Sequence, residues 1–208
     1  MLAKTELAAM LTAAADLMAE NAPMLTDIDS KFGDGDHGIT ISKIADVIRR
    51  EVAAWDDASL HDFLDDLGMA IMGVRGGSAG PLYGTLVGGL GVQLEADEVQ
   101  LDAAGVRRMF AGCLAEMQDT TDAQVGDKTM MDALIPAVQA AQDAQGDDIG
   151  AILRAAADAA AAGAKASEGF ASKYGRARSY GDKTIGTPDA GALSTSLFFE
   201  GLARGFGA

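Results

Sequence analysis

The chain has 208 residues, of which 49% are hydrophobic and only 5% aromatic, and its formal net charge is −15. This length and apolar content suffice for one folded domain with a sizeable core, which excludes a disordered chain. The negative charge argues against nucleic acid or an anionic membrane as partner, because both require basic patches. The single cysteine, Cys113, excludes an internal disulfide, and we expect it on the buried face of a helix.

Helical periodicity recurs along the chain and predicts an all-α protein. Ile41, Ile44 and Ile48, for example, follow the i, i+3, i+4 spacing of one helix face. About eight helices are expected, over residues 3–20, 39–54, a segment from the Ser59–Asp62 capping pair to Ile71, 81–95, 102–118, 128–143, 148–171 and 190–204. We expect no secretory signal in the first residues and no membrane span, because no apolar run reaches membrane-spanning length. We therefore expect a cytoplasmic protein with a single domain over residues 1–208.

The most informative segment is Asp29-Ser-Lys-Phe-Gly-Asp34-Gly-Asp36-His37-Gly38, which brings three carboxylates and one imidazole together. Clustered aspartates repel one another, and a folded protein relieves this repulsion by protonation or by a bound cation. Carboxylate oxygens without a cysteine favour a hard ion such as Mg²⁺, which completes its coordination with water and substrate phosphates. This segment therefore predicts a magnesium–phosphate site.

Simpler interpretations of the same segment are a solvated turn or a helix N-cap, for which Asp36 is well placed. The glycines of the segment also match a dinucleotide-binding pattern, but no apolar strand precedes them, which excludes that fold. An EF-hand is excluded because Lys31 and Phe32 stand where a metal ligand and a glycine are required.

Two later loops suit an anion. Residues 75–81 form a small-residue turn before a helix, where free N–H groups and the helix dipole favour phosphate, although a tight helix connection explains them equally well. Arg176 and Arg178 form a close basic pair that either clamps phosphate or balances neighbouring acids.

Other polar residues have a structural explanation. Lys128 and Lys183 each follow a Gly-Asp pair, but neither segment is a P-loop, and we expect both lysines to be solvated. Asp189 is placed to cap the last helix. His61 is expected at the surface beside its aspartate neighbour, which leaves His37 as the histidine placed for chemistry.

Taken together, these motifs resemble the nucleotide-binding subunit of dihydroxyacetone kinases, the DhaL family. The matching segments occur in one order from about residue 20 to the end: Leu25–Asp29, Gly33–Gly38, Gly76–Gly84, Gly126–Leu134, Gly175–Ala177 and Ile185–Gly191, followed by a terminal helix that contains Ser194. The resemblance implies a single-domain, antiparallel barrel or bundle of about eight helices. It places ADP or ATP and two Mg²⁺ ions at one end of that bundle.

By motif position, the resemblance implies that Asp29, Asp34 and Asp36 are the Mg²⁺ ligands. It implies a nucleotide pocket formed by His37, Gly38, Ile39, Thr40, Ser78, Ala79, Thr121, Met130, Arg176, Asp189, Ala190 and Gly191. Three of these depart from the family pattern, since asparagine is common at Thr40, glycine at Thr121 and proline at Ala190. No residue of this chain is assigned as catalytic.

The resemblance implies a phosphotransferase subunit that acts on dihydroxyacetone, or on another short ketose such as erythrulose, held by a separate ketose-binding subunit. The implied donor is either ATP or a phosphotransferase-system protein that rephosphorylates bound ADP. Two alternatives are a nucleotide-sensing regulatory partner of a transcription factor and a Mg²⁺-dependent phosphatase. The phosphatase ranks last because no aspartate lies in the apolar strand-to-loop setting of an aspartyl-phosphate nucleophile. A homodimer is a further assembly that we consider.

Overall fold

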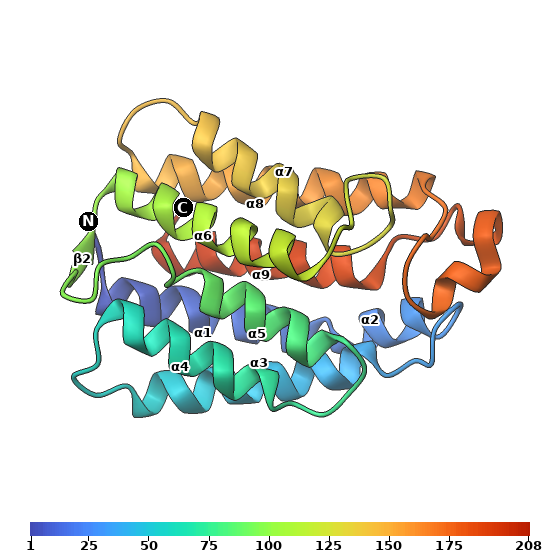
Figure 1. The fold of residues 1–208 in the computed structure, drawn as a ribbon, viewed down its shortest axis with the longest axis horizontal. Helices are drawn as coiled ribbons and strands as arrows, with labels where there is room; N and C mark the ends of the chain where they lie inside the picture. The colour runs from blue at the N-terminus through green and yellow to red at the C-terminus, as the bar shows by residue number, and fades with distance from the viewer.

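The computed structural model describes residues 1–208 and is built almost entirely of helices (Figure 1). The helices are α1 (Lys4–Glu20), α2 (Ala22–Asp29), α3 (His37–Ala54), α4 (Leu60–Met72), α5 (Ala79–Gly89), α6 (Ala103–Thr120), α7 (Met131–Asp143), α8 (Ile149–Ala166) and α9 (Ala190–Phe206), with the 3₁₀ segments η1 (Ser167–Gly169) and η2 (Arg176–Thr184) between the last two. Two-residue strands, β1 (Leu2–Ala3) and β2 (Gln100–Leu101), form one antiparallel pair. The predicted all-α class is confirmed.

The long helices lie along one axis and pack side by side as an antiparallel bundle (Figure 1). α9 lies in its centre, where it packs against α1 and α8, while α4 packs on α5 and α7 on α8. Both chain termini and the strand pair lie towards one end of the bundle (Figure 1). The opposite end carries α2, η2 and the loops before α3, α5 and α7 (Figure 1).

One continuous cluster of 50 buried residues forms the core. Its largest members include Phe198 and Phe199 of α9 and Phe110 of α6, all at most 1% exposed. Much of the remaining core is alanine, which lets the helices approach closely. Cys113 is fully buried on α6, as predicted, and Ser59 caps α4 by accepting a hydrogen bond from the Asp62 backbone N–H. No helix combines the length and apolar character needed to cross a bilayer.

The main difference from the predicted helices is α2. The predicted helices, 3–20 and then 39–54, leave the residues between them without a helix. In the structure, Pro23 instead lies in the first turn of α2. Proline fits there because the first turn has no intrahelical use for its missing N–H.

The other differences are at helix ends. The helix expected over 128–143 begins at Met131, after a loop in which Lys128 has a φ of 60°. The helix expected over 81–95 ends at Gly89, and the one expected over 148–171 ends at Ala166 before η1.

Candidate functional site

A pocket of about 560 Å³ opens at the end of the bundle that carries α2 and η2. Its walls come from the loop between α2 and α3, the start of α5, the loop before α7, and the segment from residue 172 to residue 191. The predicted site residues that line it are Asp29, Asp34, Asp36, His37, Ser78, Ala79, Met130, Arg176, Asp189, Ala190 and Gly191. Folding therefore brings together segments from both halves of the sequence.

The remaining predicted residues lie outside the pocket wall. Gly38 is buried and faces α2, Ile39 is 55% exposed, and Thr40 is 1% exposed with its hydroxyl close to Gly76. Thr121 follows α6 and accepts a hydrogen bond on its hydroxyl from the Ala123 backbone N–H. Nucleotide contacts for these four residues stay predictions from the family resemblance.

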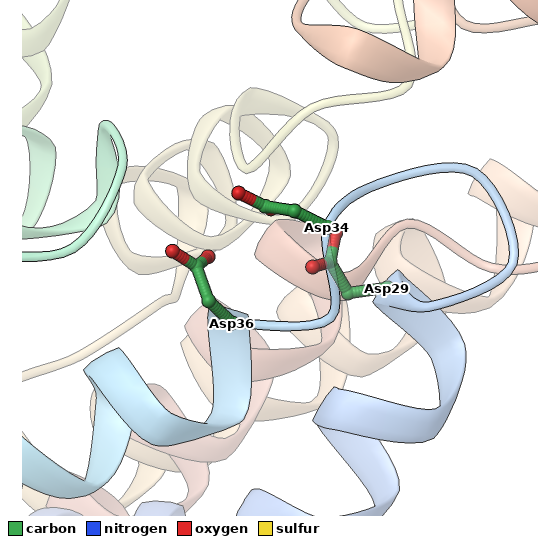
Figure 2. A group of neighbouring side chains, drawn as sticks. All are labelled: Asp29, Asp34 and Asp36. Carbon is green, nitrogen blue, oxygen red and sulfur yellow. The ribbon is translucent and has the colours of Figure 1, made fainter.

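The three clustered aspartates come from one turn (Figure 2). Asp29 ends α2, Asp34 lies in the loop, and Asp36 immediately precedes α3. One carboxylate oxygen of each lies within 4.8 Å of the others. The turn closes through a 2.8 Å hydrogen bond from the Gly35 N–H to Asp29 Oδ2, and the φ of 72° at Gly35 explains the glycine there.

The carboxylate of Asp36 does not act as a helix cap, although its residue occupies the N-cap position of α3. Burial, and then the charges of Asp34 and Asp29, raise its pKa above the usual value, while Arg176 opposes that rise. Arg176 also forms a 2.8 Å ion pair with Asp34. Convergent, mutually repelling carboxylates are the donor set of a hard divalent cation, and this cluster therefore fits Mg²⁺.

His37 begins α3 beside this cluster, and its Nε2 atom lies 2.9 Å from the Ser194 hydroxyl on α9. Burial lowers the pKa of its imidazole, and the charge of Asp29 and the Ala190 backbone oppose this shift. The contact joins residues 157 positions apart in the chain. The sequence analysis named Ser194 in the terminal helix of the family motifs, but spacing alone could not predict that it contacts His37.

The side chain of Lys128 is buried, and the prediction that it is solvated was therefore wrong. It is only 4% exposed, and its ammonium group donates hydrogen bonds to the carbonyls of Ser167, at 2.6 Å, and Thr187. Burial lowers its pKa, although nearby Asp189 and Asp132 oppose this shift. Backbone carbonyls of two other segments therefore take the place of water. Lys183, by contrast, is exposed as predicted.

The loop before α7 is organised by Asp132, a residue that the sequence interpretation did not single out. Its buried carboxylate accepts hydrogen bonds from the backbone N–H groups of Gly126 and Thr129, each at 2.6 Å. The signal was present, because this aspartate follows the Gly-Asp-Lys-Thr motif by three residues. Lys128, Thr129 and Met130 of this loop line the pocket, and Asp132 holds the loop through its two backbone hydrogen bonds.

Asp189 caps α9, as predicted, by accepting a 2.7 Å hydrogen bond from the Ala192 N–H. Burial raises the pKa of its carboxyl group to about 7, while hydrogen bonds from the Ala192 and Gly191 backbone and the charge of Lys128 oppose that rise. A pKa of about 7 means that this carboxyl group changes between its protonated and ionised forms near neutral pH.

The segment η2 lies across from the acidic turn. Its Tyr180 ring contacts the Phe32 ring edge-on, with centroids 5.3 Å apart, in addition to the ion pair between Arg176 and Asp34. Sequence reasoning also missed the apolar part of the pocket, which includes Leu82, Tyr83 and Tyr174. The pocket thus combines an acidic corner with apolar walls.

Comparison with known proteins gives this geometry a family. The model of the DAK2 domain matches residues 31–204. The ADP-binding subunit DhaL of PEP-dependent dihydroxyacetone kinase 1 from Listeria innocua is 31% identical over 187 residues, which cover 89% of this chain and 88% of that subunit. D-erythrulose kinase from Mycolicibacterium smegmatis is 34% identical over 192 residues, which cover 89% of this chain but only 32% of that kinase.

A solved structure agrees with these relatives. The crystal structure of the dihydroxyacetone kinase from C. freundii in complex with AMP-PNP and Mg²⁺ superimposes with a TM-score of 0.72 and 27% identity, covering 95% of this chain and 33% of that one. The fold, the order of the motifs and the family model all agree. The chain therefore belongs to the DAK2-domain family, which includes the DhaL subunits.

Proposed function

We propose that this chain binds ADP or ATP with Mg²⁺ and supplies the phosphoryl group in a kinase that acts on dihydroxyacetone or another short ketose. The observation that carries this proposal is the convergence of the Asp29, Asp34 and Asp36 carboxylates within 4.8 Å at a 560 Å³ pocket. Pockets of about 300–1,000 Å³ are usual for small ligands and cofactors. We further propose that residues 1–208 form one nucleotide-binding domain, with two Mg²⁺ ions at the acidic turn.

Each wall of the pocket has a role in this proposal. The three aspartates would hold Mg²⁺, which when bound neutralises the charge that develops on the transferred phosphoryl group. The free N–H groups at the start of α5, beside Ser78 and Ala79, face an anion favourably because they lie at the positive end of that helix. Arg176 supplies a guanidinium fork for a phosphate. Met130 and Leu82 offer an apolar surface to the adenine ring.

The proposed ketose substrate and the ketose-binding partner are inferred from the similar proteins. Dihydroxyacetone kinase subunits and erythrulose kinases both match this chain, which supports a short ketose substrate. The erythrulose kinase that matches here is about three times longer than the matched region, so most of that protein lies outside the similarity. A separate ketose-binding subunit, or a further ketose-binding domain, would therefore hold the sugar while this chain presents the phosphoryl group.

The decisive test of binding is calorimetric titration of the chain with ADP in the presence and absence of Mg²⁺. We expect binding that depends on Mg²⁺ and is lost in Asp34→Ala. Activity is tested by combining the chain with a ketose-binding subunit, Mg²⁺, a donor and either dihydroxyacetone or erythrulose. Mg²⁺-dependent ADP binding without formation of a ketose phosphate would instead favour a nucleotide-sensing regulatory protein.

Two donors fit the same pocket, namely free ATP and a phosphotransferase-system protein that rephosphorylates bound ADP. The Listeria relative, which this chain covers almost entirely, is a PEP-dependent ADP-binding subunit and favours the second donor. An exchange assay with labelled ADP distinguishes the two donors. A nucleotide that stays bound through many turnovers indicates a phosphotransferase-system donor, whereas exchange at every turnover indicates ATP.

A further inference from the structure

A chain of buried hydroxyl groups connects the core of the bundle to His37. The Tyr83 hydroxyl on α5 donates a 2.8 Å hydrogen bond to Ser194 Oγ on α9, and His37 Nε2 lies 2.9 Å from the same oxygen. Tyr83 is 1% exposed and Ser194 is fully buried. Three helices therefore meet through side-chain contacts at the start of α3.

Counting protons gives the direction of each contact. The Ser194 hydroxyl has one proton and two acceptor sites, and it contacts three partners. Its third partner is the Gly191 carbonyl, at 3.0 Å, which can only accept and therefore takes the serine proton. With its proton on the Gly191 carbonyl, Ser194 Oγ accepts from both Tyr83 and His37, and in the longer 3.3 Å contact between the hydroxyls of Tyr83 and Thr195 the threonine is then the donor. This arrangement requires the proton of the neutral imidazole to be on Nε2.

The consequence concerns what His37 can offer a ligand. Phosphate oxygens accept hydrogen bonds, and in this arrangement the imidazole N–H is already engaged with Ser194. The unprotonated Nδ1 atom is an acceptor as well and does not bind phosphate oxygens. The side chain is therefore suited to anchoring rather than to holding the phosphates. Because His37 directly follows Asp36, anchoring its ring also restrains the backbone that carries the last carboxylate of the acidic cluster.

We propose that Tyr83 and Ser194 are positioning residues that hold His37 as its Nε2–H tautomer and thereby anchor Asp36 and the first turn of α3 at the pocket. The inference rests on the proposed nucleotide-binding function for its effect on ligands, but not for the hydrogen-bond arrangement itself. Ser196 offers a matched control. It lies two residues along α9, and its hydroxyl donates a 2.8 Å hydrogen bond to the Leu193 carbonyl but forms none with Tyr83 or His37.

The tautomer is measured by two-bond ¹H–¹⁵N correlation spectra of the full chain labelled with ¹⁵N-histidine, without nucleotide or Mg²⁺. The chain has only two histidines, so His61→Gln assigns the signals. The spectra are recorded at mildly alkaline pH, where a free imidazole is neutral. We expect a protonated Nε2 at His37 in the wild type and in Ser196→Ala. In Ser194→Ala we expect an averaged mixture of both tautomers.

Binding of ADP with Mg²⁺ is then compared by calorimetry. We expect an affinity about tenfold weaker in Ser194→Ala, several-fold weaker in Tyr83→Phe, and unchanged in Ser196→Ala. Circular dichroism and thermal melting check each variant, and Tyr83→Phe carries the test if Ser194→Ala does not fold, because it removes one hydroxyl and keeps the ring.

Two results would overturn the inference: a protonated Nδ1 in the wild type, or unchanged tautomer and affinity in both Ser194→Ala and Tyr83→Phe. A wild type that binds no ADP would overturn the proposed function and the effect on affinity. The tautomer spectra would still report on the hydrogen-bond chain in that case.

Discussion

Asp34 is the most exposed of the three clustered carboxylates and is paired with Arg176 at the protein surface. If this cluster holds Mg²⁺, Asp34→Ala removes one ligand and weakens Mg²⁺ binding. The nucleotide phosphates then lose the positive charge that Mg²⁺ supplies. We expect the affinity for ADP in the presence of Mg²⁺ to fall at least about 100-fold, as measured by calorimetry. The free energy of unfolding should change by less than about 1 kcal/mol, because exposed ion pairs contribute little.

Asp27→Ala is the matched control for that experiment. Asp27 is also exposed, lies two residues before the cluster on α2, and changes the net charge by the same amount. We expect it to leave ADP affinity within about twofold. Equal losses in both variants would mean that overall charge, and not ligation at the cluster, controls binding.

A second prediction at this scale concerns the pH dependence of stability. Burial raises the pKa of Asp189 to about 7, well above the ordinary value of about 3.9. Between these values the folded chain keeps a proton on Asp189 that the unfolded chain has released. The contribution of this residue to the free energy of unfolding therefore falls as the pH rises through this range. The nearby charges of Lys128 and Asp132 act on the same carboxyl group.

Asp189→Asn removes this titration and keeps an oxygen that accepts from the Ala192 N–H. We expect the free energy of unfolding of the variant, relative to that of the wild type, to be roughly 2–4 kcal/mol higher at about pH 7 than at about pH 4. This is the free energy that corresponds to a pKa difference of about three units. Urea unfolding at both pH values, without ligand, provides the measurement. A stability difference that does not change with pH would show that the carboxyl group titrates normally.

At the scale of elements, the close contact of α2 and α3 holds the acidic turn in place. A methyl group added at Gly38 would lie 1.9 Å from the Ala22 carbonyl oxygen, so the two helices would have to separate. We expect Gly38→Ala to lower the free energy of unfolding by about 1–3 kcal/mol, as overpacking does. Chemical denaturation measures this loss. ADP affinity should fall as well, because Asp29 at the end of α2 and Asp36 just before α3 would move apart with the two helices.

Gly88→Ala distinguishes overpacking from the general effect of replacing a helical glycine. Gly88 lies in α5, and an added methyl group would meet only Gly68 Cα, at the ordinary contact distance of 3.7 Å. Alanine favours helix by about 1 kcal/mol over glycine, so this variant should be as stable as the wild type or more stable. If Gly38→Ala were equally well tolerated, the packing of α2 on α3 would not be what positions the turn.

At the scale of the whole molecule, the pocket joins distant parts of the chain. Its wall includes residues 28–37 near the N-terminus and residues 172–191 near the C-terminus. The ion pair between Asp34 and Arg176 and the contact between Phe32 and Tyr180 already link these segments. A ligand that fills the pocket binds only the folded chain, so its binding free energy is added to the stability of the fold.

ADP with Mg²⁺ at 100 times its Kd is therefore expected to raise the free energy of unfolding by about 2.7 kcal/mol. Removing Mg²⁺ with a chelator should abolish most of this gain, because the acidic turn then repels the phosphates. Thermal melting with ADP, with ADP and Mg²⁺, and with Mg²⁺ alone provides the comparison. An equal gain from ADP without Mg²⁺ would place the nucleotide away from the aspartates.

Local sequence determined much of this protein. The spacing of Ile41, Ile44 and Ile48 was enough to predict a helix, because one face of a helix repeats within a few residues. The three aspartates lie in one short turn, so their proximity also followed from the sequence alone. The cap formed by Asp189 is another contact between near neighbours. In each case the interacting groups are close in the chain, and the geometry of the backbone brings them together.

Only the tertiary structure decided the contacts between distant segments. The residues around Lys128 in the sequence do not indicate that its ammonium group donates to the carbonyls of Ser167 and Thr187 instead of to water. Those carbonyls belong to η1 and to the turn before α9, which are distant in the sequence. Likewise, His37 meets Ser194 only because α3 and α9 both begin at the same end of the bundle. Such pairings depend on which helices pack together. That choice is made by the burial of the whole apolar surface rather than by any local pattern.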